Sequence, residues 1–231
     1  MKIVKNESGS VAIVAVLLVA VAVVGLVGFK VMSAQDKSNT ATVSASNNVN
    51  TTKASDLRAD LVTLGVEHMS LTNKAVDDAL DGTKTANASG AALYENGTDI
   101  GAAVGSVYGA DAEKTFNTVW KLHLDQFVKY AVASSKNDEA GKKAALNTID
   151  AEYTKPLSQY LAKANPNLPA ATLETALRDH VQMTATMIDH HTKGNYEAEI
   201  KELRHANQHL KSVFSTLAGG IVKQYPEKFQ D

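Results

Sequence analysis

The chain has 231 residues, a formal net charge of −2 at pH 7 and no cysteine. This charge excludes a strongly basic nucleic-acid-binding domain, and the lack of cysteine excludes disulfides, thiolate metal sites and a cysteine nucleophile. A bound metal would need imidazole, carboxylate, methionine or water ligands. The length suits one domain with an accessory segment, and the four prolines and abundant alanine, leucine and valine favour an all-α fold.

The N-terminus has the features of a membrane anchor. Residues 1–10 are polar with two lysines, and residues 11–29 contain no charged side chain. A helix of that length is able to cross ~30 Å of hydrocarbon. We expect a cytoplasmic N-terminus (1–10) and a single-pass signal-anchor (11–32), with the remaining chain outside the cytoplasm, although the lysine bias that sets this orientation is slight. The alternative is a cleaved signal peptide, which the length of the apolar run disfavours.

The anchor is followed by a linker and then by the folded domain. Residues 33–54 are rich in serine, threonine and asparagine and offer little to bury, so we expect a flexible linker. The helical domain is expected to cover residues 55–231, with Ser55 as the N-cap of its first helix.

Apolar residues recur every three or four positions along this domain, which predicts amphipathic helices. A break is expected near Asn96-Gly97, and Pro156 allows a kink. The simplest architecture is an antiparallel four-helix-type bundle with one extra crossover helix. The bundle helices would be 56–81, 111–134, 170–192 and 196–222, the crossover 138–164, and a further helix would run from about 89 to 108.

Two similar hexapeptides organise the helical domain. Residues 67–72 and 179–184 each contain an acid, a histidine and, four residues after the histidine, a threonine. Each hexapeptide lies in the first helix of an expected pair, and the second helix of each pair carries a histidine followed by leucine, at His123 and His209. Equivalent halves would therefore bring four histidines together.

Helical phase distinguishes these four histidines. His68, His123 and His180 fall on the apolar stripes of their helices and are predicted to face inward, whereas His209 flanks its stripe. Side chains from facing helices can form a metal site in a bundle core, and neutral imidazole binds copper, zinc or iron. The alternative is that these are core histidines, hydrogen-bonded to their neighbours and binding no ligand.

Three further residues have supporting roles in the metal hypothesis. Thr72 and Thr184 stand one turn after their histidines, where a hydroxyl could bond to an imidazole or hold a water molecule. Asp99 would reach the histidines as a carboxylate. Its alternative role, which we favour, is to stabilise the first turn of a helix that starts near Thr98.

The other histidines are weaker candidates for metal ligands. His190 and His191 resemble a Met-x-x-His-His stretch of copper-associated bundles, but adjacent residues point ~100° apart on a helix. His205 completes one Glu-x-x-His sequence with Glu202, and because there is no second copy the di-iron bundle pattern is absent.

Several short stretches together form a recognisable pattern across residues 55–229. The pattern resembles a poorly characterised family of bacterial secreted or membrane-attached helical proteins. The resemblance implies a helical bundle in the cell envelope and supplies no activity. It favours four histidines, at positions 68, 123, 180 and 209, over the other three. The matching positions are Glu67-His68, Leu71-Thr72, Asp99-Ile100-Gly101, Tyr108-Gly109, His123, Asn165-Pro166, His180, Thr184, His209 and residues 220–229.

Together these features predict a membrane-anchored, extracytoplasmic helical bundle that binds a metal ion or small ligand through interior histidines. One alternative is a non-catalytic envelope interaction or structural module whose histidines are satisfied core residues. A metal-dependent enzyme is the other, but the sequence has no nucleophile elbow, phosphate loop or dinucleotide fingerprint, so we do not expect one. The expected partners are the membrane, through residues 11–29, and an envelope protein or small ligand, but not nucleic acid.

Overall fold

The structure, a computed structural model, describes residues 52–230, which are all-helical. The expected cytoplasmic N-terminus (1–10), membrane anchor (11–32) and all but the end of the linker (33–54) lie outside the described residues. None of the helices between residues 52 and 230 combines the length and apolar character that crossing a bilayer requires.

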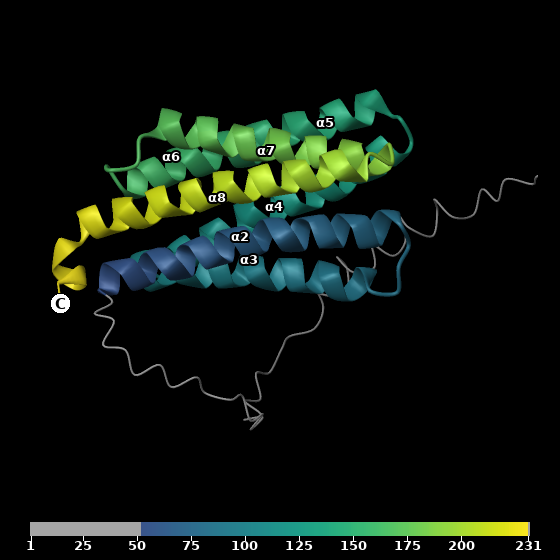
Figure 1. The fold of residues 1–231 in the computed structure, drawn as a ribbon. Coiled ribbons are helices and arrows are strands. Elements are labelled where there is room, and N and C mark those ends of the chain that lie inside the picture. Colours follow the sequence, from purple (N-terminus) through teal and green to yellow (C-terminus); the bar gives the residue numbers. More distant parts are fainter. Residues whose placement is uncertain (1–51, 231) are drawn as a thin grey trace, which may run out of the picture.

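Long helices joined by short turns make up this domain (Figure 1). A π-helical turn (Asp150–Thr154) separates two of them, and a 3₁₀ turn (Pro226–Phe229) follows the last. The helices are α2 (Lys53–Leu80), α3 (Ala86–Tyr108), α4 (Ala110–Ser135), α5 (Glu139–Ile149), α6 (Lys155–Ala164), α7 (Ala170–Thr192) and α8 (Tyr196–Gln224).

The first helix begins slightly earlier than the sequence suggested, because Thr52 rather than Ser55 is its N-cap. The Thr52 hydroxyl accepts a hydrogen bond from the Ser55 N–H at 3.1 Å, and the Ser55 hydroxyl accepts one from the Thr52 N–H at 2.9 Å. This reciprocal pair satisfies two backbone donors that the helix itself leaves free.

The helices form a closed ring in chain order. Each helix packs against the next, and α8 returns to pack against α2. If α5, the π turn and α6 are taken as one bent helix, residues 52–230 form a bundle of six packed helices that run along a common direction (Figure 1). Gly109 (φ 90°) and Gly194 (φ 71°) lie at two of the sharp reversals, where the left-handed backbone favours glycine.

The six-helix ring differs from the expected four-helix core with a crossover. Both α3 and the bent α5–α6 helix are full members of the wall, because each has an apolar face that must be buried. Leu93 and Ile100 of α3 are buried, as are Ile149 and Leu157 of the bent helix. A domain of this size is therefore built from more helices around one core than the simplest pairing suggested.

Two local expectations had different outcomes. Helix α3 is continuous through Asn96-Gly97, where we had expected a break. A Cβ atom on Gly97 would lie 2.8 Å from the Trp120 ring, so this glycine allows α3 and α4 to approach closely. The chain does become irregular just before Pro156, where the Lys155 N–H bonds to the Asp150 carbonyl in the π turn. This wider turn relieves the clash that proline causes in a regular helix.

Candidate metal centre

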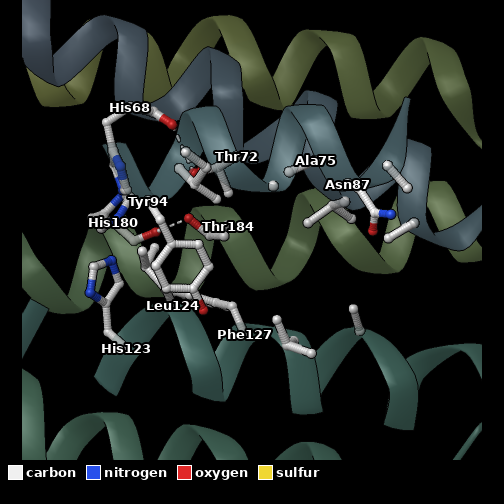
Figure 2. Close-up of a pocket in the computed structure, with 17 residues that line it drawn as sticks. His68, Thr72, Ala75, Asn87, Tyr94, His123, Leu124, Phe127, His180 and Thr184 are labelled. Atoms are coloured by element: carbon white, nitrogen blue, oxygen red, sulfur yellow. Dashed lines mark hydrogen bonds between the residues drawn. The ribbon is translucent and has the colours of Figure 1, made fainter. Parts of the chain in front are cut away.

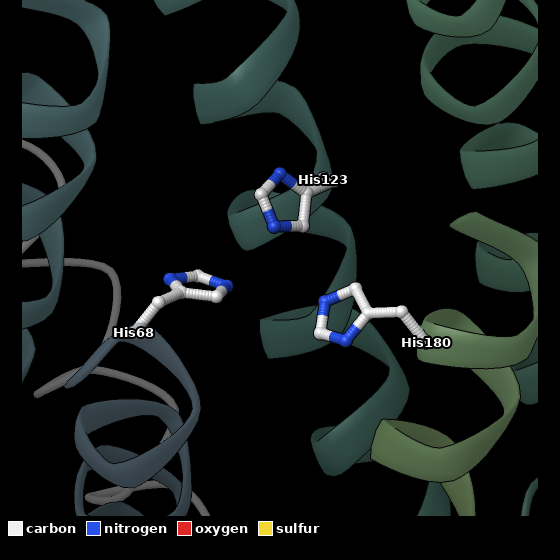
Figure 3. Close-up of side chains that lie close together, drawn as sticks. All are labelled: His68, His123 and His180. Carbon is white, nitrogen blue, oxygen red and sulfur yellow. The ribbon is translucent and has the colours of Figure 1, made fainter. Parts of the chain in front are cut away.

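Three buried histidines meet in the middle of the bundle (Figure 3). His68 on α2, His123 on α4 and His180 on α7 have exposed fractions of 1%, 0% and 2%. One ring nitrogen of each lies within 4.8 Å of the corresponding nitrogens of the other two. The ring centroids are 5.7 to 6.4 Å apart. The three that we predicted to face inward therefore share one site, which we call the histidine trio.

The ring of helices explains why these three side chains converge. Helices α2, α4 and α7 are alternate members of the ring, and they contact one another across the core. On α4, the buried residues Phe116, Trp120, His123 and Phe127 recur every three or four positions, so His123 lies on the inward stripe. Figure 3 shows the three rings pointing toward one another from their separate helices.

The hydrogen bonds of His123 leave one nitrogen free. Its Nδ1–H donates to the Trp120 carbonyl oxygen, which fixes the tautomer and leaves a lone pair on Nε2. In the described part of the chain, His123 Nε2 has no hydrogen-bond partner, and neither do the buried Nδ1 atoms of His68 and His180. Buried polar atoms are normally paired, so the incomplete hydrogen bonding of all three rings calls for an explanation.

The trio is uncharged near neutral pH. Burial lowers the pKa of His68 to about 4, an effect that the Asn96 side chain against it partly offsets. The pKa of His180 falls to about 3, first because of burial and then because of repulsion from His68 and His209. Burial, followed by repulsion from the other two, also holds the pKa of His123 well below its usual value. All three imidazoles are thus available as neutral ligands.

A small apolar cavity adjoins the trio. Figure 2 shows the three histidines at one end of this cavity, whose volume is about 50 Å³. This volume is large enough for one or a few water-sized molecules. A second cavity of about 60 Å³ also touches His180, with Trp120, Tyr153 and Phe214 in its lining. The walls of the first cavity include Ala75, Ala79, Leu93, Leu124, Phe127 and Ala131.

Two aromatic residues of the site were not recognised from the sequence. Tyr153, in the π turn, stacks on His123 with ring centroids 4.3 Å apart and planes 20° from parallel. Trp120, on α4, packs its ring against both His68 and His123. π turns often occur at functional sites, and the helix irregularity at Pro156 was the one sequence signal near Tyr153.

Between residues 52 and 230, the supporting residues form no hydrogen bond to an imidazole of the trio. The hydroxyls of Thr72 and Thr184 donate to the carbonyls of His68 and His180, one turn earlier, rather than bonding to an imidazole. Threonine in a helix often bonds to its own backbone in this way. Asp99 is exposed in the middle of α3 because that helix starts at Ala86, so neither a role at the trio nor one in a first helical turn applies.

The remaining histidines are separate from the trio. His209 is half-buried, and its Nε2 bonds to the Ala176 carbonyl at 2.8 Å, consistent with its position beside the apolar stripe of α8. His205 is exposed, 3.8 Å from Glu202. His190 is half-buried in the last turn of α7. His191 is buried and belongs to a second group, with Asp77 and Glu199.

The comparisons with known proteins found no match, either among protein-family models, among curated proteins or among solved structures. Function therefore has to be argued from the site itself.

Proposed function

We propose that this protein binds one transition-metal ion through His68, His123 and His180, in a domain held outside the cytoplasm by a membrane anchor at residues 11–29. The observation that carries the proposal is the convergence of three buried, neutral imidazoles whose hydrogen bonds are incomplete. A core of satisfied histidines, the alternative that the sequence left open, is expected to pair its buried nitrogens, so the incomplete bonding supports the proposal.

The distances fit a metal site with a small adjustment. Three nitrogens no more than 4.8 Å apart enclose a centre that is at most ~2.8 Å from each, whereas a zinc–imidazole bond is ~2.1 Å. Inward movements of less than about 1 Å would close the site, which is within the reach of side-chain rotation. The bond from His123 Nδ1–H to the Trp120 carbonyl is the kind of support that orients a metal-binding histidine.

The ligand set favours zinc, copper or iron. It consists of three neutral nitrogen donors, and between residues 52 and 230 neither a carboxylate nor a thiolate belongs to the same group. Imidazole suits these metals, whereas magnesium and calcium prefer oxygen. A three-histidine set also leaves a coordination position for a small ligand, and the apolar cavity beside the trio offers space for one.

Metal loading of the full-length protein tests the proposal. We expect the purified chain to retain about one equivalent of zinc, copper or iron after desalting, and to melt at a higher temperature with metal than after chelation. At a free metal concentration of 1,000 times Kd the stabilisation is ~4 kcal/mol. The variant His68→Gln with His180→Gln should lose both effects, while the control His190→Gln with His205→Gln should keep them.

Either of two results would overturn the metal assignment. The first is a wild-type chain that retains no metal, and the second is a trio variant with normal helix content by circular dichroism that still binds as wild type does. If the double variant does not fold, the single variant His180→Gln replaces it, with the same expected loss.

The anchor is tested separately. Deleting residues 1–32 should move the protein from the membrane fraction to the soluble fraction, because the charge-free stretch would be gone. Recovery of the full chain in the soluble fraction would contradict the anchoring.

A further inference from the structure

A second cluster of metal-ligating side chains lies at one end of the bundle. Asp77 is near the end of α2, His191 near the end of α7, and Glu199 in the first turn of α8. The Nδ1 atom of His191 lies 2.9 Å from Asp77 Oδ1 and 3.0 Å from Glu199 Oε2. His191 and Glu199 are buried, with exposed fractions of 7% and 2%, whereas the Asp77 side chain is 31% exposed, so the cluster extends from the interior to the surface.

Two neighbouring residues hold these groups in position. The buried amide of Asn73 donates to Asp77 Oδ2 at 2.6 Å and to Glu199 Oε1 at 2.8 Å, so it joins the outer oxygens of both carboxylates. Asp81 Oδ1 lies 3.3 Å from His191 Nε2. A carboxylate behind the far nitrogen of a histidine is the usual support of a metal ligand, because it takes the ring N–H and leaves the other nitrogen free to coordinate.

The atoms that face one another in this cluster, His191 Nδ1 and two carboxylate oxygens, have too few hydrogens for all three to be hydrogen-bonded among themselves. When Nε2–H of His191 donates to Asp81, Nδ1 presents a lone pair to two carboxylate oxygens. Even a protonated His191 has a single hydrogen on Nδ1, and Glu199 Oε2 is its partner. Asp77 Oδ1 is buried and accepts no hydrogen bond from residues 52–230.

The charges of the cluster are also unbalanced. Asp77, Asp81 and Glu199 are three carboxyl groups around a single imidazole. The ion pairs between residues 52 and 230 include no lysine or arginine bonded to any of the three. Uncompensated charge is costly at a buried group such as Glu199, and a bound cation is one way to neutralise it.

We propose that Asp77, His191 and Glu199 form a second metal site, which takes an octahedral, oxygen-preferring divalent cation such as Mn²⁺. Two ligands at right angles, each ~2.1 Å from such a cation, are ~3.0 Å apart. The observed separations of 2.9 and 3.0 Å match this spacing. One nitrogen among oxygen donors favours manganese over magnesium or calcium, and Asp81, with an exposed side chain, marks the route from solvent.

Binding of Mn²⁺ to the full-length protein tests this site. The six-line electron paramagnetic resonance signal of free Mn²⁺ should decrease as protein is added. Glu199→Gln and Asp77→Asn should each weaken binding at least about tenfold, and Asp81→Asn, which acts on the orientation of His191, by ~10–100-fold. Asp60→Asn, which changes an exposed acid on α2, the helix of Asp77, is the matched control. The variant His68→Gln with His180→Gln should bind Mn²⁺ as wild type does, which separates this site from the trio.

Melting curves show whether a variant that binds no Mn²⁺ is still folded. Glu199→Gln removes charge from a crowded site, so without metal it should melt at or above the wild-type temperature, yet gain nothing from Mn²⁺. If it fails to fold, Asp77→Asn, whose side chain is half-buried, carries the same test. The proposal is overturned if wild type leaves Mn²⁺ free at millimolar concentration, or if folded Glu199→Gln and Asp77→Asn bind it as wild type does. The cluster would then hold a shared proton in place of a cation.

Discussion

The two histidine clusters of this bundle differ in charge, because one is neutral and the other contains carboxylates. The trio at the centre consists of nitrogen donors among aromatic and aliphatic side chains, and burial keeps its imidazoles neutral. The cluster at the end of the bundle surrounds His191 with carboxylates. Burial works to lower the pKa of His191, but the charges of Asp77 and Glu199 outweigh it and raise that pKa above its usual value.

The difference shows how much the surroundings decide about a histidine. His180 and His191 lie on the same helix, three turns apart, and both are buried. The pKa of His180 is lowered to about 3, whereas that of His191 is raised. A neutral cluster suits metals that prefer nitrogen, and an anionic one suits cations that prefer oxygen.

Acid should lower the free energy of unfolding mainly through the histidine trio, and this is the largest effect that we expect. His68 and His180 have pKa values of about 4 and about 3 in the fold, against 6.5 for a free histidine. The unfolded chain therefore binds more protons below pH 6.5, and stability falls as the pH falls toward 4. Between pH 7 and 5 each of the two histidines accounts for about 2 kcal/mol of lost stability, about 4 kcal/mol together.

Urea unfolding of the chelated protein at both pH values measures this loss. Wild type should lose about 4 kcal/mol more than the variant His68→Gln with His180→Gln, since Asp77 and the other groups are common to both chains. Equal losses in the two chains would show that the histidines are not protonated on unfolding.

A side chain added at Gly65, where α2 packs closely against Phe214, should have the next largest effect on stability. A Cβ atom on Gly65 would lie 2.3 Å from the ring of Phe214, which is buried and lines the cavity next to His180. Gly65→Ala should therefore destabilise the protein by about 1–3 kcal/mol. Gly90→Ala is the control, because a Cβ atom there meets nothing within 4 Å. It should be neutral or stabilising by ~0.5–1 kcal/mol in denaturant titrations.

The polar residues beside the two clusters should behave differently. Thr184→Val removes a hydroxyl that donates to the His180 carbonyl, so it should cost about 1 kcal/mol and leave metal binding at the trio unchanged. Asn73→Leu removes the amide that joins Asp77 to Glu199, so it should weaken Mn²⁺ binding by ~10–100-fold. Calorimetric titration of each variant with each metal measures both affinities. If either variant weakened metal binding equally at the two clusters, the two sites would not be independent.

The smallest effect is expected at Asp77, with the opposite sign to that of the trio. Burial, then hydrogen bonding and repulsion from Glu199, raise the pKa of Asp77 to about 7, against 3.8 for a free aspartate. Its contribution to stability is therefore present in acid and lost as the pH rises through 7. Asp77→Asn should stabilise the metal-free protein at pH 8 by up to about 1 kcal/mol, a modest figure because the side chain is partly exposed. Destabilisation at pH 8 would contradict the charge crowding.

Local periodicity was enough to locate most helices and the inward faces of three. Residues 170–192 form α7 as predicted, and His68, His123 and His180 face inward as their apolar stripes indicated. Both results follow from helix geometry, which depends only on spacing along the chain. The same phase argument singled out His209, which flanks its stripe and bonds to Ala176 instead of joining the trio.

Only the tertiary structure decided which faces meet. Pairing helices by similarity placed α2, α4 and α7 in one bundle, but it did not predict that α3 is a wall helix of a closed ring or that His209 of α8 lies outside the trio. The second cluster depends on the tertiary structure still more, because Asp77, His191 and Glu199 come from three helices and share no sequence motif. Spacing along a chain determines which side of a helix a residue occupies, whereas its neighbours depend on how apolar faces from distant segments are buried together.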